Sequence, residues 1–170
     1  MKTCIAYYSQ SGNTKMAAEY LAEKINADLI TLRDETKYKG ILGFVKGGMN
    51  ASLAKKAKLS RAFFDEIAKF DRIILATPVW AGKTTPAINA ILSAVDFEGK
   101  EVYVLTTQAD PNCKGADNRK AFYKNAVGAK HGTFLALFSL HGSSPGATAS
   151  REDMIQRVDS AVDIALFTKP

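Results

Sequence analysis

Apolar runs and helical patterns alternate along the whole chain. Strand-like apolar runs predict β-strands at Thr3–Tyr8, Ala27–Leu32, Arg72–Ala76, Glu101–Thr106 and Gly132–Ser139. Helical periodicity follows these runs at Thr14–Ile25, Arg61–Lys69, Thr85–Ala94, Gly115–Val127 and Ser150–Phe167. The apolar runs lack polar alternation, which is typical of parallel strands that helices cover on both faces. The pattern therefore predicts an α/β fold with a doubly wound, five-stranded parallel sheet.

Length and composition indicate one domain over residues 1–170. Hydrophobic residues make up 46% of the chain and charged residues 24%, which is ordinary for a globular protein. The apolar runs are much shorter than a membrane span, and the N-terminus does not resemble a signal peptide. Two cysteines and two histidines are too few for a disulfide framework or a metal cluster. We therefore expect a cytoplasmic protein without a bound metal and without stable membrane insertion.

A hydroxyl-rich segment, Ser9–Thr14, joins the first apolar run to the first helical pattern. Main-chain N–H groups at the start of a helix have no helical partner, and the helix dipole is positive at that end. Hydroxyls of Ser9, Ser11 and Thr14 add further donors, and the first basic residue is Lys15. The segment therefore predicts a phosphate site built mostly from neutral donors. The alternative is an ordinary capped turn between a strand and a helix.

Two more loops are expected at the same edge of the sheet, Thr77–Lys83 after the third strand and Thr107–Asn112 after the fourth. The first contains Trp80, the single tryptophan of the chain, in a turn between Pro78 and Gly82. An aromatic side chain in such a turn suits the face of a flat ring system, whose polar edge main-chain donors can bind. The alternative is that Trp80 covers the core at the edge of the sheet.

Taken together, these three loops resemble the binding signature of the flavodoxin family, and the resemblance extends over nearly the full chain. Ser9–Thr14 is similar to the phosphate motif Ser/Thr-x-Ser/Thr-Gly-x-Thr, and Trp80 is similar to the aromatic residue that flavodoxins stack on the flavin. The resemblance implies the strand order 2-1-3-4-5, a ligand site where the first and third strands diverge, and FMN as the cofactor. It names no catalytic residue, and the cofactor-binding residues that it implies are Ser9, Gln10, Ser11, Gly12, Asn13, Thr14, Thr77, Pro78, Val79, Trp80, Ala81, Gly82, Lys83, Thr107, Gln108, Ala109 and Asp110.

Three patterns typical of other protein classes are disfavoured. Thr77–Thr84 falls one residue short of a nucleotide-binding P-loop, because a threonine stands where the first glycine belongs. Cys113–Arg119 has the spacing of a phosphatase loop, but the cysteine does not directly follow a strand, as a thiolate nucleophile would require. A phospho-receiver domain needs acidic residues at the end of its first strand, where this chain has Ser9 and Gln10.

The positive charge is concentrated in one segment. The net charge is +6, and Lys37–Arg61 contains seven basic residues and no acid, so the remainder is close to neutral. Apolar residues recur there at helical spacing, but four glycines weaken a helix, and we predict a long connection that covers the sheet or the flavin pocket. The alternatives are docking of an acidic partner or of an anionic membrane surface. Nucleic acid is disfavoured, because no base-stacking residues accompany the charge. Electron-carrying flavodoxins are generally acidic, so in its charge this chain departs from the family that it resembles.

The best interpretation of these features is an FMN-dependent redox protein, an electron carrier of flavodoxin type that exchanges electrons with a partner protein. The loop Thr107–Asn112 lacks the tyrosine with which many flavodoxins cover the second flavin face. That face is open unless a residue from elsewhere in the chain, such as Tyr38 or Phe44, covers it. An open face suits the alternative, an FMN-dependent oxidoreductase that takes hydride from NAD(P)H and reduces a quinone or similar acceptor. A third possibility is a non-enzymatic module that binds a phosphorylated ligand.

Lys83 is expected to lie either near the pyrimidine end of the flavin or in solvent.

Overall fold

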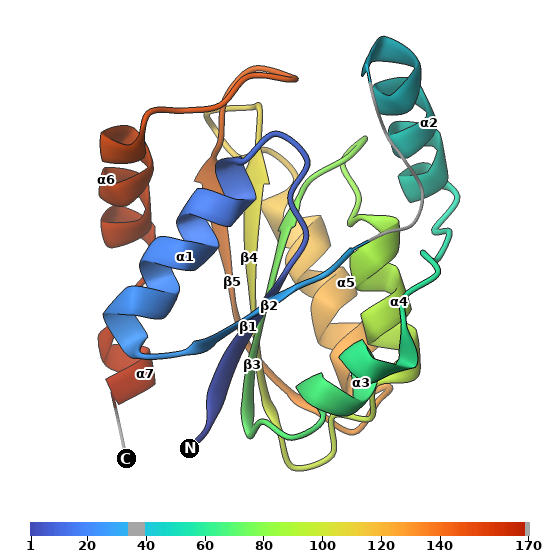
Figure 1. Cartoon of the computed structure of the whole chain (residues 1–170), viewed down its shortest axis with the longest axis vertical. Helices are drawn as coiled ribbons and strands as arrows, with labels where there is room; N and C mark the ends of the chain where they lie inside the picture. Colours follow the sequence, from blue (N-terminus) through green and yellow to red (C-terminus); the bar gives the residue numbers. More distant parts are fainter. Residues whose placement is uncertain (34–39, 169–170) are drawn as a thin grey trace.

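The computed structural model describes residues 1–33 and 40–168, and Figure 1 shows its five strands forming one sheet. All neighbouring strands are parallel, in the order β2-β1-β3-β4-β5, which confirms the predicted fold class. The strands are β1 (Thr3–Tyr7), β2 (Asp28–Thr31), β3 (Arg72–Pro78), β4 (Glu101–Gln108) and β5 (Thr133–His141). The helices are α1 (Asn13–Ile25), α2 (Gly40–Ser52), α3 (Arg61–Ile67), α4 (Pro86–Ala94), α5 (Ala116–Gly128), α6 (Arg151–Ala161) and α7 (Ala165–Thr168).

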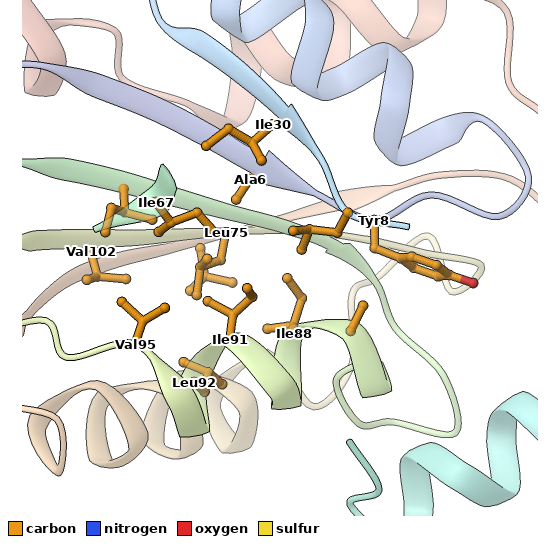
Figure 2. Close-up of a cluster of buried hydrophobic side chains, with 14 of the residues drawn as sticks. Ala6, Tyr8, Ile30, Ile67, Leu75, Ile88, Ile91, Leu92, Val95 and Val102 are labelled. Carbon is orange, nitrogen blue, oxygen red and sulfur yellow. The ribbon is translucent and has the colours of Figure 1, made fainter. Parts of the chain in front are cut away.

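Helices cover both faces of the sheet. In Figure 1, α1, α6 and α7 lie on one face and α3, α4 and α5 on the other, while α2 lies near the edge where the strands end. Alternate residues of β1 enter the two hydrophobic cores: Cys4 and Ala6 pack toward α3–α5, and Ile5 and Tyr7 pack toward α1 and α6. Figure 2 shows the first of these cores, with Tyr8 at its end. This burial on both faces explains why the strands show no polar alternation.

Helix α2 corrects the prediction of an irregular connection after β2. Its residue Gly47 has no room for a side chain, since a Cβ there would lie 2.9 Å from Cζ3 of Trp80. The glycine permits the helix to approach the indole closely, and such tertiary packing outweighs the poor intrinsic helix propensity of glycine. The sequence pattern correctly placed helical periodicity here, but it could not show the contact that stabilises the helix.

The single helix predicted over Ser150–Phe167 is also wrong, because the structure has two helices there. Val162 has the extended backbone conformation and ends α6. The carboxylate of Asp163 then accepts a hydrogen bond from the backbone N–H of Ala165, at 3.0 Å, where α7 begins. A β-branched residue followed by a capping aspartate is a signal in the sequence that one helix ends and another begins. The apolar periodicity continues through Val162 and Asp163, which is why the sequence pattern predicted one helix.

Three strands are longer than predicted. Thr77 and Pro78 belong to β3 and pair with Thr106 and Thr107 of β4, and Gln108 pairs with His141 of β5. Residues expected in the binding loops therefore lie on strands, where the sheet fixes their backbones.

Candidate functional site

The ends of β1, β3 and β4 bring two of the predicted loops into direct contact. Oγ1 of Thr14, at the start of α1, lies 2.7 Å from Oγ1 of Thr107 near the end of β4, and both residues are buried. The backbone N–H of Val79 donates to the carbonyl oxygen of Thr107 at 2.9 Å, which ties the loop after β3 to the same place. The candidate site therefore lies at the carboxyl edge of the sheet, where parallel α/β sheets bind ligands.

The start of α1 has the properties of an anion site. Its N-cap residue, Gly12, has a φ of 95° and has no side chain with which to cap the helix. The first turn contains no acidic residue. Main-chain donors and the positive end of the helix dipole thus remain available for an anion.

Ser9 supplies a second observation. Its Oγ is buried and has no hydrogen-bond partner among residues 1–33 and 40–168. A buried polar group without a partner costs about 1–3 kcal/mol, so such groups call for an explanation. A ligand oxygen bound next to the uncapped helix would provide the missing partner.

Other side chains of the anion loop hold the neighbouring chain in place. The side-chain amide of Asn13 donates to the Ser11 hydroxyl at 3.0 Å and to the carbonyl oxygen of Ala147 at 2.8 Å. Its Oδ1 accepts a hydrogen bond from the backbone N–H of Ala149 at 2.8 Å, and the hydroxyl of Thr148 donates to the carbonyl oxygen of Ser11. Asn13 therefore fastens the segment after β5 against the anion loop, in a role that sequence analysis did not assign. Gln10 is exposed at the rim.

The segment between β5 and α6 is the part of the site that sequence analysis missed. It lies beside the N-terminus of α1, and a Cβ added to Gly12 would lie 3.4 Å from Cγ2 of Thr148. The local sequence, Ser143–Gly146, indicates only a turn. Its position depends on the hydrogen bonds of Asn13 from more than 130 residues away, and no pattern within either segment predicts that pairing.

The loop after β3 forms a tight turn rather than a phosphate cradle. The backbone N–H groups of Trp80 and Lys83 each donate to the other residue's carbonyl oxygen, at 3.0 and 2.9 Å. Ala81 and Gly82 between them have φ values of 47° and 73°, which is the conformation of a type I′ turn. These backbone donors are already used, which argues against a P-loop. Ala81, Gly82 and Lys83 are exposed at the tip of the turn.

Trp80 itself is buried, with 7% of its surface exposed. Its ring packs edge-on against Tyr8, with centroids 5.6 Å apart, and contacts Gly47 of α2. The indole thus belongs to the hydrophobic core and also borders the candidate site. Whether it stacks on a flavin stays a prediction.

Two predicted site residues direct their side chains elsewhere. The hydroxyl of Thr77 lies 2.9 Å from that of Thr85 at the start of α4. Oε1 of Gln108 accepts a hydrogen bond from Nη2 of Arg119 at 2.5 Å. Both side chains support the surrounding structure, and only their backbones border the site.

The loop after β4 is held together by Asp110. Its carboxylate accepts hydrogen bonds from the backbone N–H groups of Asn112 and Lys114, at 3.0 and 3.1 Å, and the first of these is the main reason why its pKa is lowered. Ala109 is exposed beside it. Tyr38 lies outside the described residues, as does the side chain of Phe44, so the proposal that either covers an open flavin face stays untested.

The cysteines show no sign of nucleophilic activation. Burial raises the pKa of the Cys113 thiol, despite the positive charge of Arg119 nearby, and it raises the pKa of Cys4 to about 12. A catalytic thiolate requires the opposite shift. The C-x5-R spacing of Cys113 and Arg119 is therefore not a phosphatase loop.

In the part of the chain that the structure describes, no helix has the length and apolar character needed to cross a bilayer. No curated protein matches the chain significantly.

Solved structures share the fold. A protein from Bacteroides uniformis has 22% sequence identity and a TM-score of 0.70, and the match covers 93% of this chain and 97% of that one. A flavoprotein from Lactobacillus acidophilus, solved in complex with FMN, has 19% identity and a TM-score of 0.64 over 81% of this chain and 92% of its own. Oxidised flavodoxin 1 from Bacillus cereus has 17% identity and a TM-score of 0.58 over 98% and 97% of the two chains.

The family assignment rests on the sequence. The family model described as flavodoxin matches residues 2–140, which include β1 to β4 and nearly all of β5. That region contains the anion loop, the Trp80 turn and the loop after β4. The chain therefore belongs to the flavodoxin family.

Proposed function

We propose that the protein binds FMN and acts as an electron carrier of flavodoxin type. The observation that carries this proposal is the buried, unpartnered hydroxyl of Ser9 beside the uncapped N-terminus of α1. These donors fit a phosphate group, and the family assignment and the FMN complex of the Lactobacillus acidophilus protein support FMN as the molecule that carries it.

Ser9 and the backbone of residues 11–14 would hold the phosphate. The turn at Trp80–Lys83 and the loop that begins at Ala109, directly after β4, would flank the ring system. When bound, FMN supplies one- and two-electron redox chemistry. The protein's part is to bind and orient the cofactor and to limit its contact with water, and no general acid or base is needed for that.

The carrier role is distinguished from the reductase role by the reaction with NADPH. We expect anaerobic stopped-flow mixing with NADPH or NADH to reduce the FMN-loaded protein slowly and without saturation, while dithionite reduces it fully. Rapid, saturable reduction by either nucleotide would instead establish the reductase, which the loop without an aromatic residue favours. A protein that binds no flavin but does bind other phosphorylated compounds would overturn both roles.

We further propose that an acidic protein partner docks on the basic segment. Lys46, Lys55, Lys56, Lys58 and Arg61 are exposed, while Lys37 and Lys39 lie outside the described residues. Two apolar side chains of the same segment are also unusually exposed, Met49 at 54% and Leu53 at 62%. Apolar residues surrounded by charges of one sign are typical of a surface that recruits an oppositely charged partner. Helix α2 also contacts Trp80, so a partner bound there would lie close to the proposed flavin site.

Charge reversal tests this surface. We expect Lys55→Glu combined with Lys56→Glu to slow electron transfer from an acidic [2Fe–2S] ferredoxin by about tenfold or more at low salt, because steered association can raise on-rates by roughly 10–1,000-fold. For the unmodified protein, the rate should also fall as salt rises to about 0.15 M, where the Debye length is about 8 Å.

A matched double reversal at Lys69 and Lys124, both exposed and outside the segment, is the control and should leave the rate nearly unchanged. Equal effects of the two double variants would show that net charge matters and that the segment does not. Lost FMN affinity in the Lys55 and Lys56 variant would place the segment in the flavin pocket.

A further inference from the structure

A cavity of about 190 Å³ lies beside the Trp80 turn and is separate from the anion loop. The end of α2 forms one wall, the tip of the turn a second and the first half of α5 a third. The residues that line it include Ala51, Ala54, Lys83, Asn118, Arg119 and Phe122. None of the residues around the cavity belongs to Ser9–Thr14 or to the loop after β4. The proposed flavin phosphate site does not account for the cavity, although the cavity shares the tip of the Trp80–Lys83 turn with the proposed site of the flavin ring.

Arg119 is a buried cation in this wall, with 5% of its surface exposed. Its guanidinium donates to Oε1 of Gln108 and to the carbonyl oxygen of Lys114, the second at 3.0 Å, while Nε is buried without a partner in the described ranges. Gly115 has a φ of 76° and leaves room for the head group, since a Cβ there would lie 3.2 Å from Nη1. The protein thus builds a specific place for this side chain.

Arg119 has no carboxylate partner within the described ranges 1–33 and 40–168. Among the described residues, no acidic side chain forms an ion pair with it. Asp110 acts on it electrostatically, but the carboxylate of Asp110 is already bound by two backbone N–H groups. Buried charges are normally paired, so this arrangement leaves a positive potential at the cavity wall.

The other residues around the cavity indicate which kind of anion it would bind. Lys83 is a second cation, and the side-chain amide of Asn118 can donate directly to an oxygen. Phe122 is 44% exposed and, with Ala51 and Ala54, provides an apolar surface. Among the residues that the structure describes, no aspartate or glutamate lines the cavity. A cavity of about 150 Å³ is known to hold one benzene molecule, so this one has room for a substituted ring.

We propose that this cavity binds a small aromatic carboxylate, with the carboxylate toward Arg119, Lys83 and Asn118 and the ring against Phe122, Ala51 and Ala54. Asn118 and Arg119 lie about one helical turn before Phe122 on α5, so donors and an aromatic ring stand next to each other, as the two halves of such a molecule require. The proposal goes beyond the redox function and does not depend on it.

Benzoate, with benzamide as its neutral counterpart, tests the proposal. In calorimetric titrations of FMN-saturated protein, we expect benzoate to bind saturably and at least tenfold more tightly than benzamide. In ¹⁵N spectra, the side-chain signals of Asn118 and of Nε of Arg119 should move with the same dissociation constant. Failure to saturate, or equal affinity for the two compounds, would overturn the proposal.

Variants separate the cavity from other anion sites. Asn118 is exposed near the N-terminus of α5, where aspartate is well tolerated, so Asn118→Asp should fold normally and weaken benzoate at least tenfold. Lys124→Met, farther along α5, should leave benzoate binding unchanged. An unaffected Asn118→Asp variant would also overturn the proposal. If the protein binds no FMN, the same titrations can be carried out in saturating inorganic phosphate. The proposal that the cavity binds a carboxylate is then tested separately from the proposal that the protein binds FMN.

Discussion

Replacing Ser9 with alanine is expected to weaken FMN binding about ten- to a hundredfold while leaving the apoprotein at least as stable as before. A hydrogen bond to a charged group contributes about 1.5–3 kcal/mol, and each 1.4 kcal/mol is a factor of ten in affinity. The Ser9 hydroxyl is buried and has no hydrogen-bond partner among the described residues. Its removal therefore relieves part of a desolvation cost of about 1–3 kcal/mol.

Opposite effects on affinity and stability are what distinguish a ligand-binding hydroxyl from a structural one. Calorimetric titration with FMN and with riboflavin, combined with thermal unfolding of the apoprotein, measures both effects. Riboflavin lacks the phosphate, so its affinity should not change. Ser160→Ala, which removes an exposed hydroxyl on α6, is the matched control. If Ser9→Ala lowers the affinity for riboflavin by the same factor as the affinity for FMN, Ser9 does not contact phosphate.

Thr14 provides a contrast within the same loop. Its hydroxyl already lies 2.7 Å from that of Thr107, so Thr14→Ala removes a hydrogen bond of the folded apoprotein and leaves Thr107 without its partner. Both stability and affinity should fall. The sequence places Ser9 and Thr14 in one motif, and only the structure separates their roles.

The sheet could be predicted from the sequence because its strands are continuous apolar runs between helical patterns. Burial on both faces, as for Ile73–Ala76, leaves a signal that needs no knowledge of distant contacts. Helix α2 lacked such a signal. Its glycines read as helix breakers, although Gly47 is there because the Trp80 ring occupies the space of its side chain.

The parts of the candidate site whose residues are adjacent in sequence could be predicted, and the parts that depend on contacts between distant residues could not. The hydroxyls, the helix start and the turn glycines are adjacent in sequence, so the anion loop was found. The segment after β5 was missed because two hydrogen bonds of Asn13 determine its position. The buried Arg119 was considered only for its spacing from Cys113, and its contact with Gln108 could not be read from the chain.

Replacing Trp80 with alanine is expected to lower the free energy of unfolding of the apoprotein by about 3–5 kcal/mol, the usual cost of deleting a buried tryptophan ring. Trp80 packs between Tyr8 and Gly47, so the loss also frees α2 from the sheet edge. Urea unfolding of the apoprotein measures the change. As the single tryptophan, Trp80 also reports on the site, and its fluorescence should be strongly quenched when FMN binds.

Two neighbouring glycines test whether this packing is specific. At Gly47 a Cβ would lie 2.9 Å from Cζ3 of Trp80, whereas at Gly48 it would lie 3.8 Å from the Cβ of Ala81, an ordinary contact. Gly47→Ala should therefore destabilise the apoprotein by about 1–3 kcal/mol through overpacking. Gly48→Ala should be neutral or stabilising by up to about 1 kcal/mol, because alanine is the better helix former. Equal effects at the two positions would mean that α2 does not rest on the indole. If FMN draws the ring away from α2, Gly47→Ala should lower the free energy of unfolding less in the FMN-loaded protein than in the apoprotein. An equal loss in both forms, together with unquenched Trp80 fluorescence, would show that the role of Trp80 is purely structural.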